Sequence, residues 1–173
     1  MTPEARAALV KAVVFDVDGV LTDGSLFYGP TGEAMKRFDV KDGHGMVLAR
    51  LTGLPVAILT ARTSPFVEAR AKELRLAHVF QGRVEKGAGF VELAAALQLA
   101  PGELAYMGDD VNDLPALSRA GLSGCPADAV DDVRRQVHFV STRPGGHGAA
   151  REFLELILKA TGRWEAALEH TRK

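Results

Sequence analysis

Short apolar runs alternate with amphipathic stretches along most of the chain, and this alternation constrains the fold more than any other feature. Each run is short enough to be one buried strand, and the stretches between the runs place apolar residues at helical spacing. Strands that alternate with helices form a parallel sheet with helices on its faces. The sequence therefore predicts an α/β fold, with strands at 12–15, 54–59, 78–80, 104–107, 122–125 and 137–140 and helices that include 111–120, 127–136 and 148–160.

Length, charge and cysteine content exclude several classes of protein. The 173 residues suit one domain with its own core, so we expect a single domain over 1–173 with a polar, fraying tail from about 161. A formal net charge of −1 creates no field that would attract nucleic acid or an anionic membrane. Cys125 is the only cysteine, which excludes an intrachain disulfide and favours a reducing compartment. Because we find neither a signal-peptide pattern nor a run of membrane-spanning length, we expect a cytoplasmic protein with no nucleic-acid or membrane partner.

The segment 21–38 interrupts the alternation of strands and helices. It carries three glycines and one proline between two short apolar pieces, and the run YGPTGE at 28–33 is strong turn chemistry. We therefore predict a β-hairpin that projects from the domain. Phe27 and Tyr28 would be exposed on this hairpin in a monomer, which favours an interface between copies of the chain.

Polar and charged residues gather at the ends of the predicted strands. Taken singly, each is explained as a turn former, a helix cap or a solvated side chain. Taken together they fit one site, because the carboxyl ends of parallel strands meet at one edge of the sheet, where ligands bind. Lone buried carboxylates are costly, so a metal, a cationic partner or a reaction is needed there. The residues are Asp16, Asp18, Thr60, Lys86, Asp109, Asp110 and Asp113.

The carboxylates in this set suit phosphoryl transfer. Asp16 and Asp109 offer hard oxygen ligands for Mg²⁺, and the backbone carbonyl of Asp18 could add another. With the metal and Lys86 offsetting charge repulsion, a phosphate dianion could approach and be attacked by Asp16, which would give an aspartyl-phosphate. Asp18 is placed to protonate the leaving alkoxide and later to deprotonate the hydrolytic water.

The other residues suit supporting roles. The Thr60 hydroxyl, nearby backbone N–H groups and Lys86 would bind the phosphoryl oxygens. Asp113, one helical turn past Asp109, could accept a hydrogen bond from Lys86 or from a metal-bound water, and Asp110 stands beside it. The set therefore predicts a metal-dependent reaction on a small phosphorylated molecule.

The same residues resemble the four motifs of the haloacid dehalogenase superfamily of phosphatases: DVDGV at 16–20, Thr60, Lys86 and GDDVND at 108–113. The match covers almost the whole chain. It implies a Rossmann-like (haloacid dehalogenase-like) sheet and a phosphatase with Asp16 as nucleophile, Asp18 as general acid/base and Mg²⁺ as cofactor. The spacing of the motifs leaves room for the hairpin and for no inserted cap domain. The second aspartate of the first motif argues against a dehalogenase.

Further runs resemble the sugar-acid phosphatase branch, which includes 3-deoxy-D-manno-octulosonate 8-phosphate phosphatases: LTDG at 21–24, KDGHG at 41–45, TAR at 60–62 and GGHGAARE at 145–152. The resemblance implies a small phosphorylated sugar acid as substrate and a homotetramer that the hairpin helps to assemble. It also implies substrate contacts from Arg62, Lys41 and His44, although 41–45 fits equally well a turn and N-cap before a helix from Met46. Ala61 stands where this branch often has glycine, which leaves the exact sugar acid open.

Two alternatives stay open from the sequence. The chain could be a phosphatase for other small phosphate esters, such as simple sugar phosphates. It could instead be a non-catalytic, phosphatase-like module that drives tetramer formation. The intact Asp16, Asp18, Lys86 and Asp109 weigh against the module, because a purely structural domain gains nothing from carboxylates at strand ends.

Overall fold

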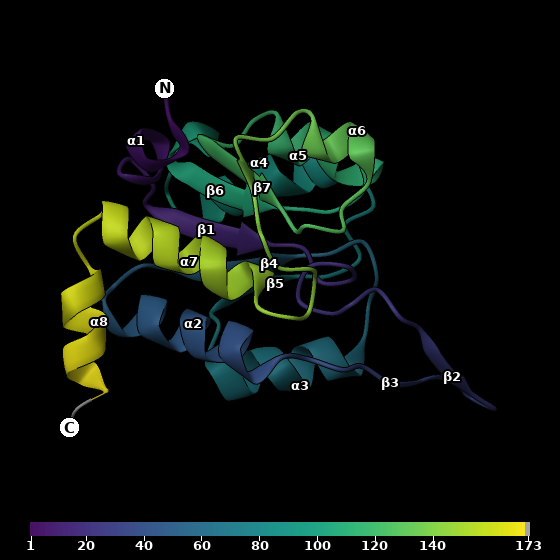
Figure 1. Ribbon diagram of the computed structural model, residues 1–173. Coiled ribbons are helices and arrows are strands. Elements are labelled where there is room, and N and C mark those ends of the chain that lie inside the picture. The colour runs from purple at the N-terminus through teal and green to yellow at the C-terminus, as the bar shows by residue number, and fades with distance from the viewer. Residues whose placement is uncertain (172–173) are drawn as a thin grey trace.

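A six-stranded parallel sheet forms the centre of the computed structural model, which describes residues 1–171 (Figure 1). The strand order is β5-β4-β1-β6-β7-β8. All residues of β1, β4, β6 and β7 are buried, as expected for parallel strands covered on both faces. The predicted α/β sheet is confirmed. Its strands are β1 (Ala12–Phe15), β4 (Val56–Leu59), β5 (His78–Phe80), β6 (Leu104–Met107), β7 (Leu122–Cys125) and β8 (Phe139–Val140).

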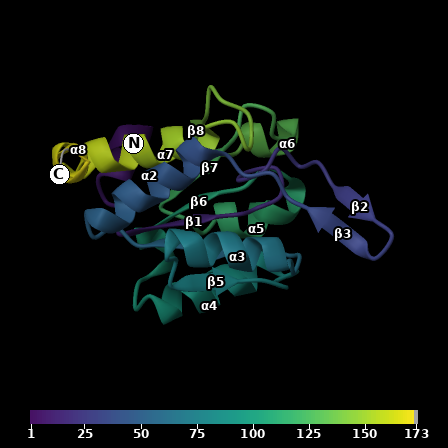
Figure 2. The same cartoon turned by 90° about the horizontal axis from the view of Figure 1, so that it is seen from below.

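Helices cover both faces of the sheet (Figures 1 and 2). Successive residues of β1 point into opposite layers: Val13 and Phe15 pack in one hydrophobic cluster, and Ala12 and Val14 pack in the other. Among residues 1–171, no helix is both long and apolar enough to cross a membrane. The first layer holds α1 (Pro3–Ala7), α2 (Val40–Leu51), α3 (Pro65–Leu74), α7 (Ala149–Ala160) and α8 (Trp164–His170); the second holds α4 (Lys86–Ala96), α5 (Leu114–Leu117) and α6 (Asp131–Arg134).

The predicted hairpin is present and projects from the domain beyond the carboxyl end of β1 (Figure 2). It consists of β2 (Phe27–Gly29) and β3 (Gly32–Met35), paired antiparallel with a register shift between Phe27 and Tyr28. Within residues 1–171 the motifs are separated only by elements of the sheet, its helices and this hairpin, so the domain has no cap.

The segment 41–45 differs from the sequence prediction. It is not a turn before a helix that begins at Met46, because α2 already begins at Val40. The Asp39 side chain caps this helix by accepting hydrogen bonds from the backbone N–H groups of Lys41 at 2.7 Å and Asp42 at 3.1 Å. The stabilised N-terminus moves the start of the helix six residues upstream of the expected one.

Two predicted helices are shorter than expected. The segment 111–120 divides into a 3-10 turn, η2 (Val111–Asp113), and the short helix α5, and 127–136 forms only α6. At the first site the Asp113 side chain accepts bonds from the backbone N–H groups of Asp109 and Asp110, which tightens the turn. At the second, Val130 is extended, so α6 begins after it. A further 3-10 turn, η1, spans Pro101–Glu103.

The polar tail is more ordered than predicted. Residues after 161 form α8, in which Ala167 is buried and Trp164 packs against the first hydrophobic cluster. Lys159 Nζ lies 5.0 Å from the centre of the Trp164 ring, a cation–π contact that joins α8 to α7. Most of the predicted polar tail is therefore helical, and residues 172–173 lie outside the described part.

Candidate active site

The strand ends enclose a hollow of about 240 Å³ at the carboxyl edge of the sheet. Asp16 directly follows β1, Thr60 directly follows β4, and Gly108 joins the end of β6 to Asp109. The central position of β1 between β4 and β6 brings these ends together. The hollow is lined by Asp16, Asp18, Gly19, Gly24, Thr60, Ala61, Arg62, Asp109, Asp110 and Asn112.

A buried lysine holds two carboxylates at the floor of the hollow. Lys86 is the first residue of α4, and its Nζ lies 2.8 Å from Asp16 Oδ1 and 2.9 Å from Asp113 Oδ1. The same Nζ donates to the Tyr106 hydroxyl and to the Leu59 carbonyl, both at 3.1 Å. A buried ammonium group is tolerated only with such partners. We refer to Asp16, Lys86, Tyr106, Asp109 and Asp113 as the inner cluster.

Asp113 organises the loop that carries Asp109. Its Oδ1 accepts a 2.6 Å hydrogen bond from the Tyr106 hydroxyl as well as the contact from Lys86. Its Oδ2 accepts from the backbone N–H groups of Asp109 at 3.0 Å and Asp110 at 3.4 Å. Both carboxylate oxygens are thus occupied by donors of the protein. Asp113 therefore fixes the loop through hydrogen bonds.

The inner cluster has the donor set for a divalent cation. Asp16, Asp109 and Asp113 each offer an oxygen, and these oxygens lie within 4.8 Å of one another. Within residues 1–171, the Asp109 carboxylate accepts no hydrogen bond. Burial, followed by the negative charges of Asp113 and Asp16, raises the pKa of Asp109 to about 8. A hard cation bound to these oxygens would offset the repulsion between the carboxylates and favour their charged forms, so the residues fit Mg²⁺.

Asp16 is also shifted by its surroundings. Burial is the main cause that raises its pKa to about 6, Asp113 adds to the rise, and Lys86 opposes it. Gly19 keeps the space beside the carboxylates open: its φ is +83°, and a Cβ there would lie 2.0 Å from Asp109 Oδ2. A glycine at this position therefore serves both the turn after β1 and the approach of Asp109.

The hairpin contributes a second group of ion pairs, on the outer side of the hollow. Lys36 Nζ lies 2.5 Å from Asp18 Oδ1 and 2.9 Å from Glu33 Oε1. Arg62 approaches the same two carboxylates, with Nε 3.7 Å from Asp18 Oδ2 and Nη2 3.4 Å from Glu33 Oε1. Ser64 Oγ donates to Glu33 Oε2 at 2.5 Å. We refer to Asp18, Glu33, Lys36, Arg62 and Ser64 as the outer cluster.

Comparison with known proteins identifies the family. The model of the haloacid dehalogenase-like hydrolases matches residues 33–121. The chain is 40% identical over 162 residues to the 3-deoxy-D-manno-octulosonate 8-phosphate phosphatase of Yersinia pestis, a match that covers 94% of this chain and 87% of that protein. This chain belongs to the haloacid dehalogenase-like hydrolases. The predicted resemblance to phosphatases of this superfamily, and the prediction of an enzyme, are confirmed.

Two solved structures resemble this hydrolase closely. The 3-deoxy-D-manno-octulosonate 8-phosphate phosphatase of Moraxella catarrhalis, in complex with magnesium, phosphate and a KDO molecule, has a TM-score of 0.93 at 36% identity, and the match covers 98% of this chain and 97% of that one. The cobalt-bound deoxy-D-mannose-octulosonate 8-phosphate phosphatase of Haemophilus influenzae has a TM-score of 0.89 at 39% identity, covering 91% and 92%. Both relatives hold a divalent metal, which agrees with the donor set of the inner cluster.

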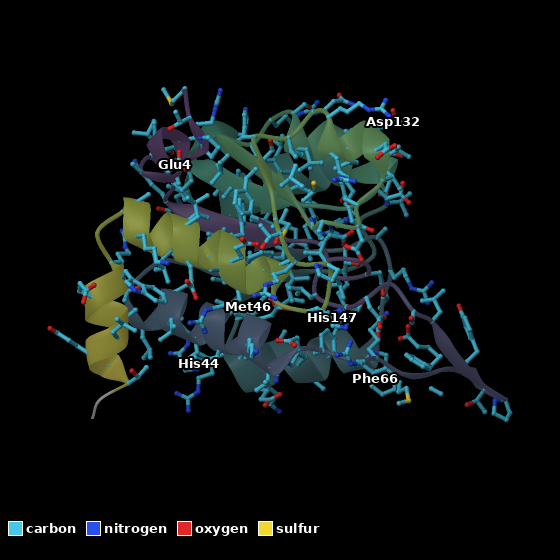
Figure 3. All side chains as sticks on the ribbon, in the orientation of Figure 1. Glu4, His44, Met46, Phe66, Asp132 and His147 are labelled. Atoms are coloured by element: carbon cyan, nitrogen blue, oxygen red, sulfur yellow. The ribbon has the colours of Figure 1, made fainter. Side chains whose placement is uncertain are left out.

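Most of the predicted site residues lie together at the carboxyl edge of the sheet, but Lys41 and His44 do not. His44 is exposed on α2, away from the strand ends (Figure 3). Lys41 lines a different hollow, of about 300 Å³, together with His147 and Arg151. Their predicted contact with substrate stays a prediction. The residues brought together are Asp16, Asp18, Thr60, Arg62, Lys86, Asp109, Asp110 and Asp113.

Sequence reasoning missed four residues of the two clusters: Tyr106, Glu33, Lys36 and Ser64, which the sequence suggests only as a helix N-cap. Tyr106 lies inside an apolar run, where a tyrosine passes as a core residue, and its hydroxyl partner is seven positions away. Glu33 lies in β3 and Lys36 directly follows it, and their contacts with Asp18 and Arg62 depend on how the base of the hairpin lies beside the loops after β1 and β4. The only signal for Lys36 and Glu33 was an i,i+3 pair of opposite charges within the predicted hairpin.

Proposed function

We propose that this hydrolase removes phosphate from a small phosphorylated sugar acid, 3-deoxy-D-manno-octulosonate 8-phosphate or a close relative, with Mg²⁺ as cofactor. The observation that carries the proposal is the cluster of Asp16, Asp109 and Asp113 around Lys86, beside a hollow that also presents Arg62. The identity with a phosphatase of that name over 94% of the chain supports the substrate class.

Asp16 is the nucleophile of the proposed reaction. It lies at the end of β1 on the floor of the hollow, with the Lys86 ammonium 2.8 Å from Oδ1. Lys86 offsets the negative charge of an arriving phosphoryl group, which lets the carboxylate attack phosphorus and form an aspartyl-phosphate. Asp16, Asp109 and the backbone carbonyl of Asp18 would hold Mg²⁺, which when bound neutralises charge and polarises the phosphoryl oxygens.

Asp18 is the proton donor and acceptor. It lines the same hollow two residues after the nucleophile, where it would serve the leaving-group oxygen of a bound ester. It gives a proton to the leaving alkoxide as the P–O bond breaks, and it takes one from the water that hydrolyses the aspartyl-phosphate. The Thr60 hydroxyl and Lys86 bind the phosphoryl oxygens, where charge is held in the transition state.

Arg62 gives the proposed site its preference for an acid. Its guanidinium lies at the rim of the hollow, and its side chain is 40% exposed. Within residues 1–171 the protein contacts are made by Nε and Nη2, with Asp18, Glu33 and the Tyr28 hydroxyl, so Nη1 is left to donate to a carboxylate of the substrate. A planar guanidinium binds a carboxylate through two parallel hydrogen bonds. The carboxylate of a sugar acid would be recognised here, whereas a plain sugar phosphate would leave this group unused.

We also propose that copies of the chain assemble through the hairpin, as a homotetramer. Large apolar side chains are exposed on it, including Tyr28 at 65% and Met35 at 51%. Val40, at the base of the hairpin, is 74% exposed. Exposed apolar groups concentrated on one projecting element favour a contact between proteins. Light scattering coupled to gel filtration measures the mass directly.

Phosphate release from a panel of esters tests the proposed function. The panel contains phosphorylated eight- and nine-carbon sugar acids, simple sugar phosphates and p-nitrophenyl phosphate, each with Mg²⁺ and with chelator. We expect Mg²⁺-dependent turnover that is highest on a sugar acid, lost in Asp16→Asn and kept in Asp132→Asn, whose side chain is exposed on α6. Broad, weak turnover would indicate a phosphatase for other small esters. No turnover by the folded protein would favour the non-catalytic module.

A further inference from the structure

The hairpin provides the nearest cation for Asp18. Lys86 is committed to Asp16 and Asp113, and its contacts do not include Asp18. Within residues 1–171, the cations that pair with Asp18 are Lys36, with Nζ 2.5 Å from Oδ1, and Arg62, with Nε 3.7 Å from Oδ2. Only the contact from Lys36 is short enough for a hydrogen bond. The second aspartate of the motif therefore has its own lysine, which comes from a different element than the one serving the first.

Lys36 is itself held in place by a chain of contacts that ends in the domain. Its Nζ lies 2.9 Å from Glu33 Oε1, and the other oxygen of Glu33 accepts from Ser64 Oγ at 2.5 Å. The backbone N–H of Ser64 in turn donates to Gln81 Oε1 at 2.8 Å. The side chain of Lys36 is 1% exposed. The long, flexible side chain of Lys36 is thus held through Glu33, which is in turn anchored to residues before α3 and after β5.

We propose that Lys36 is a positioning residue that holds the Asp18 carboxylate in the orientation required for proton transfer, so that the hairpin is part of the catalytic machinery. An ammonium group only donates, so the Asp18 oxygen it touches, Oδ1, acts as an acceptor and Oδ2 is left to carry the transferred proton. Asp18 is 22% exposed and lies in a loop, where an unpaired carboxylate would rotate freely. A displacement of about 1 Å in such a group can cost about 100-fold in rate.

This inference rests on the proposed function, and leaving-group dependence separates the two. An alkoxide leaves with a proton, whereas p-nitrophenolate leaves without one, so only the alkyl ester needs a correctly oriented Asp18. The value of kcat/KM covers the steps up to departure of the leaving group. It is measured for p-nitrophenyl phosphate and for the primary alkyl phosphate that the wild type hydrolyses best.

Six proteins are compared: wild type, Lys36→Met, Lys36→Arg, Asp18→Asn, the Asp18→Asn/Lys36→Met double variant and, as the control, Lys72→Met, whose lysine is exposed on α3. We expect Lys36→Met to lower kcat/KM for the alkyl ester by up to about 100-fold and to change the aryl ester little. Lys36→Arg restores part of the loss, and Lys72→Met behaves as wild type. Added to Asp18→Asn, the methionine variant causes no further loss on the alkyl ester. A melting curve for each variant shows that it is folded.

Different failures have different meanings. Equal losses on the two esters would overturn the inference, because Lys36 would then act on the phosphoryl group or on the fold. An unchanged kcat/KM for the alkyl ester would overturn it as well. In both cases the wild type still hydrolyses both esters, so the proposed function stands. A wild type that hydrolyses neither ester, with Mg²⁺ present, would overturn the proposed function and this inference together.

Discussion

The inner and outer clusters flank the same hollow, but the fold builds them in different ways. The inner cluster is assembled from strand ends of the central sheet and the start of α4, and the side chains of Lys86 and Asp113 in it are completely buried. The outer cluster joins the hairpin to the loops after β1 and β4, and its Asp18 and Arg62 reach solvent. We infer that charges placed by the sheet contribute to the stability of the fold, whereas charges placed by the hairpin can contribute to activity alone.

The largest effect is expected from removing the inner lysine. Lys86→Met leaves Asp16 and Asp113 buried without their cation, which costs about 3–5 kcal/mol of unfolding free energy and abolishes turnover. Lys36→Met is the matched substitution in the outer cluster. It should cost much less, because Asp18 can take up water instead. Urea unfolding of both variants measures the difference, and equal losses would remove the distinction between the clusters.

The second effect concerns the metal and pH. The pKa of Asp109 is raised from 3.8 to about 8, so the folded, metal-free protein keeps a proton that the unfolded chain releases. The stability of the metal-free protein should therefore fall as pH rises from about 4 to about 8. Mg²⁺ must displace this proton, so the rise in Tm caused by Mg²⁺ should be larger at about pH 8.5 than at about pH 6.

Asp109→Asn is the control for this titration. Asparagine does not titrate in this range, so the variant should lose the fall in stability between about pH 6 and pH 8 and most of the shift in Tm with Mg²⁺. The fall below pH 6 should remain in part, because burial also raises the pKa of Asp16 to about 6. Asp110→Asn, which removes a carboxylate outside the cluster of three metal donors, should keep a shift with the pH dependence of the wild type. A Tm shift that is independent of pH in the wild type would contradict the account of Asp109. Differential scanning calorimetry provides the curves.

The smallest effect is expected at the rim of the outer cluster. Arg62→Gln should raise KM for a phosphorylated sugar acid by about tenfold, equivalent to about 1.4 kcal/mol, and should leave KM for p-nitrophenyl phosphate nearly unchanged. The control is Arg135→Gln, because Arg135 is an exposed arginine that caps the C-terminus of α6. The same increase in KM for both esters would show that Arg62 acts on the phosphoryl group or on Asp18 instead of on the substrate carboxylate.

The same contrast explains what the sequence could predict. Asp16 and Thr60 directly follow buried strands, and Asp109 follows β6 after one glycine. The parallel sheet alone therefore brings them to one edge, and the pattern of apolar runs was enough to find them. Lys86 was found from its order among the motifs. The structure adds what the order could not, namely that its ammonium lies between Asp16 and Asp113.

Other features depended on tertiary contacts that no local pattern records. The position of Lys36 follows from the fold of the hairpin over the loop after β1, and periodicity does not reveal such a contact. The early start of α2 follows from a cap by Asp39, which the pattern of apolar residues does not contain. α8 forms because Trp164 and Ala167 pack against the hydrophobic cluster of the first layer, although the segment has the composition of a polar tail.

Trapping the covalent intermediate tests the central claim most directly. Asp18→Asn is mixed with Mg²⁺ and p-nitrophenyl phosphate, quenched in acid and weighed as an intact protein, with the Asp16→Asn/Asp18→Asn double variant as control. Because the leaving group needs no proton and the hydrolytic base is missing, the single variant should gain one phosphoryl group, located at residue 16, and the double variant none. A phosphoryl group on another residue would contradict the account. Turnover of the ester by a variant that carries Asp16→Asn and gains no covalent phosphate would contradict it as well.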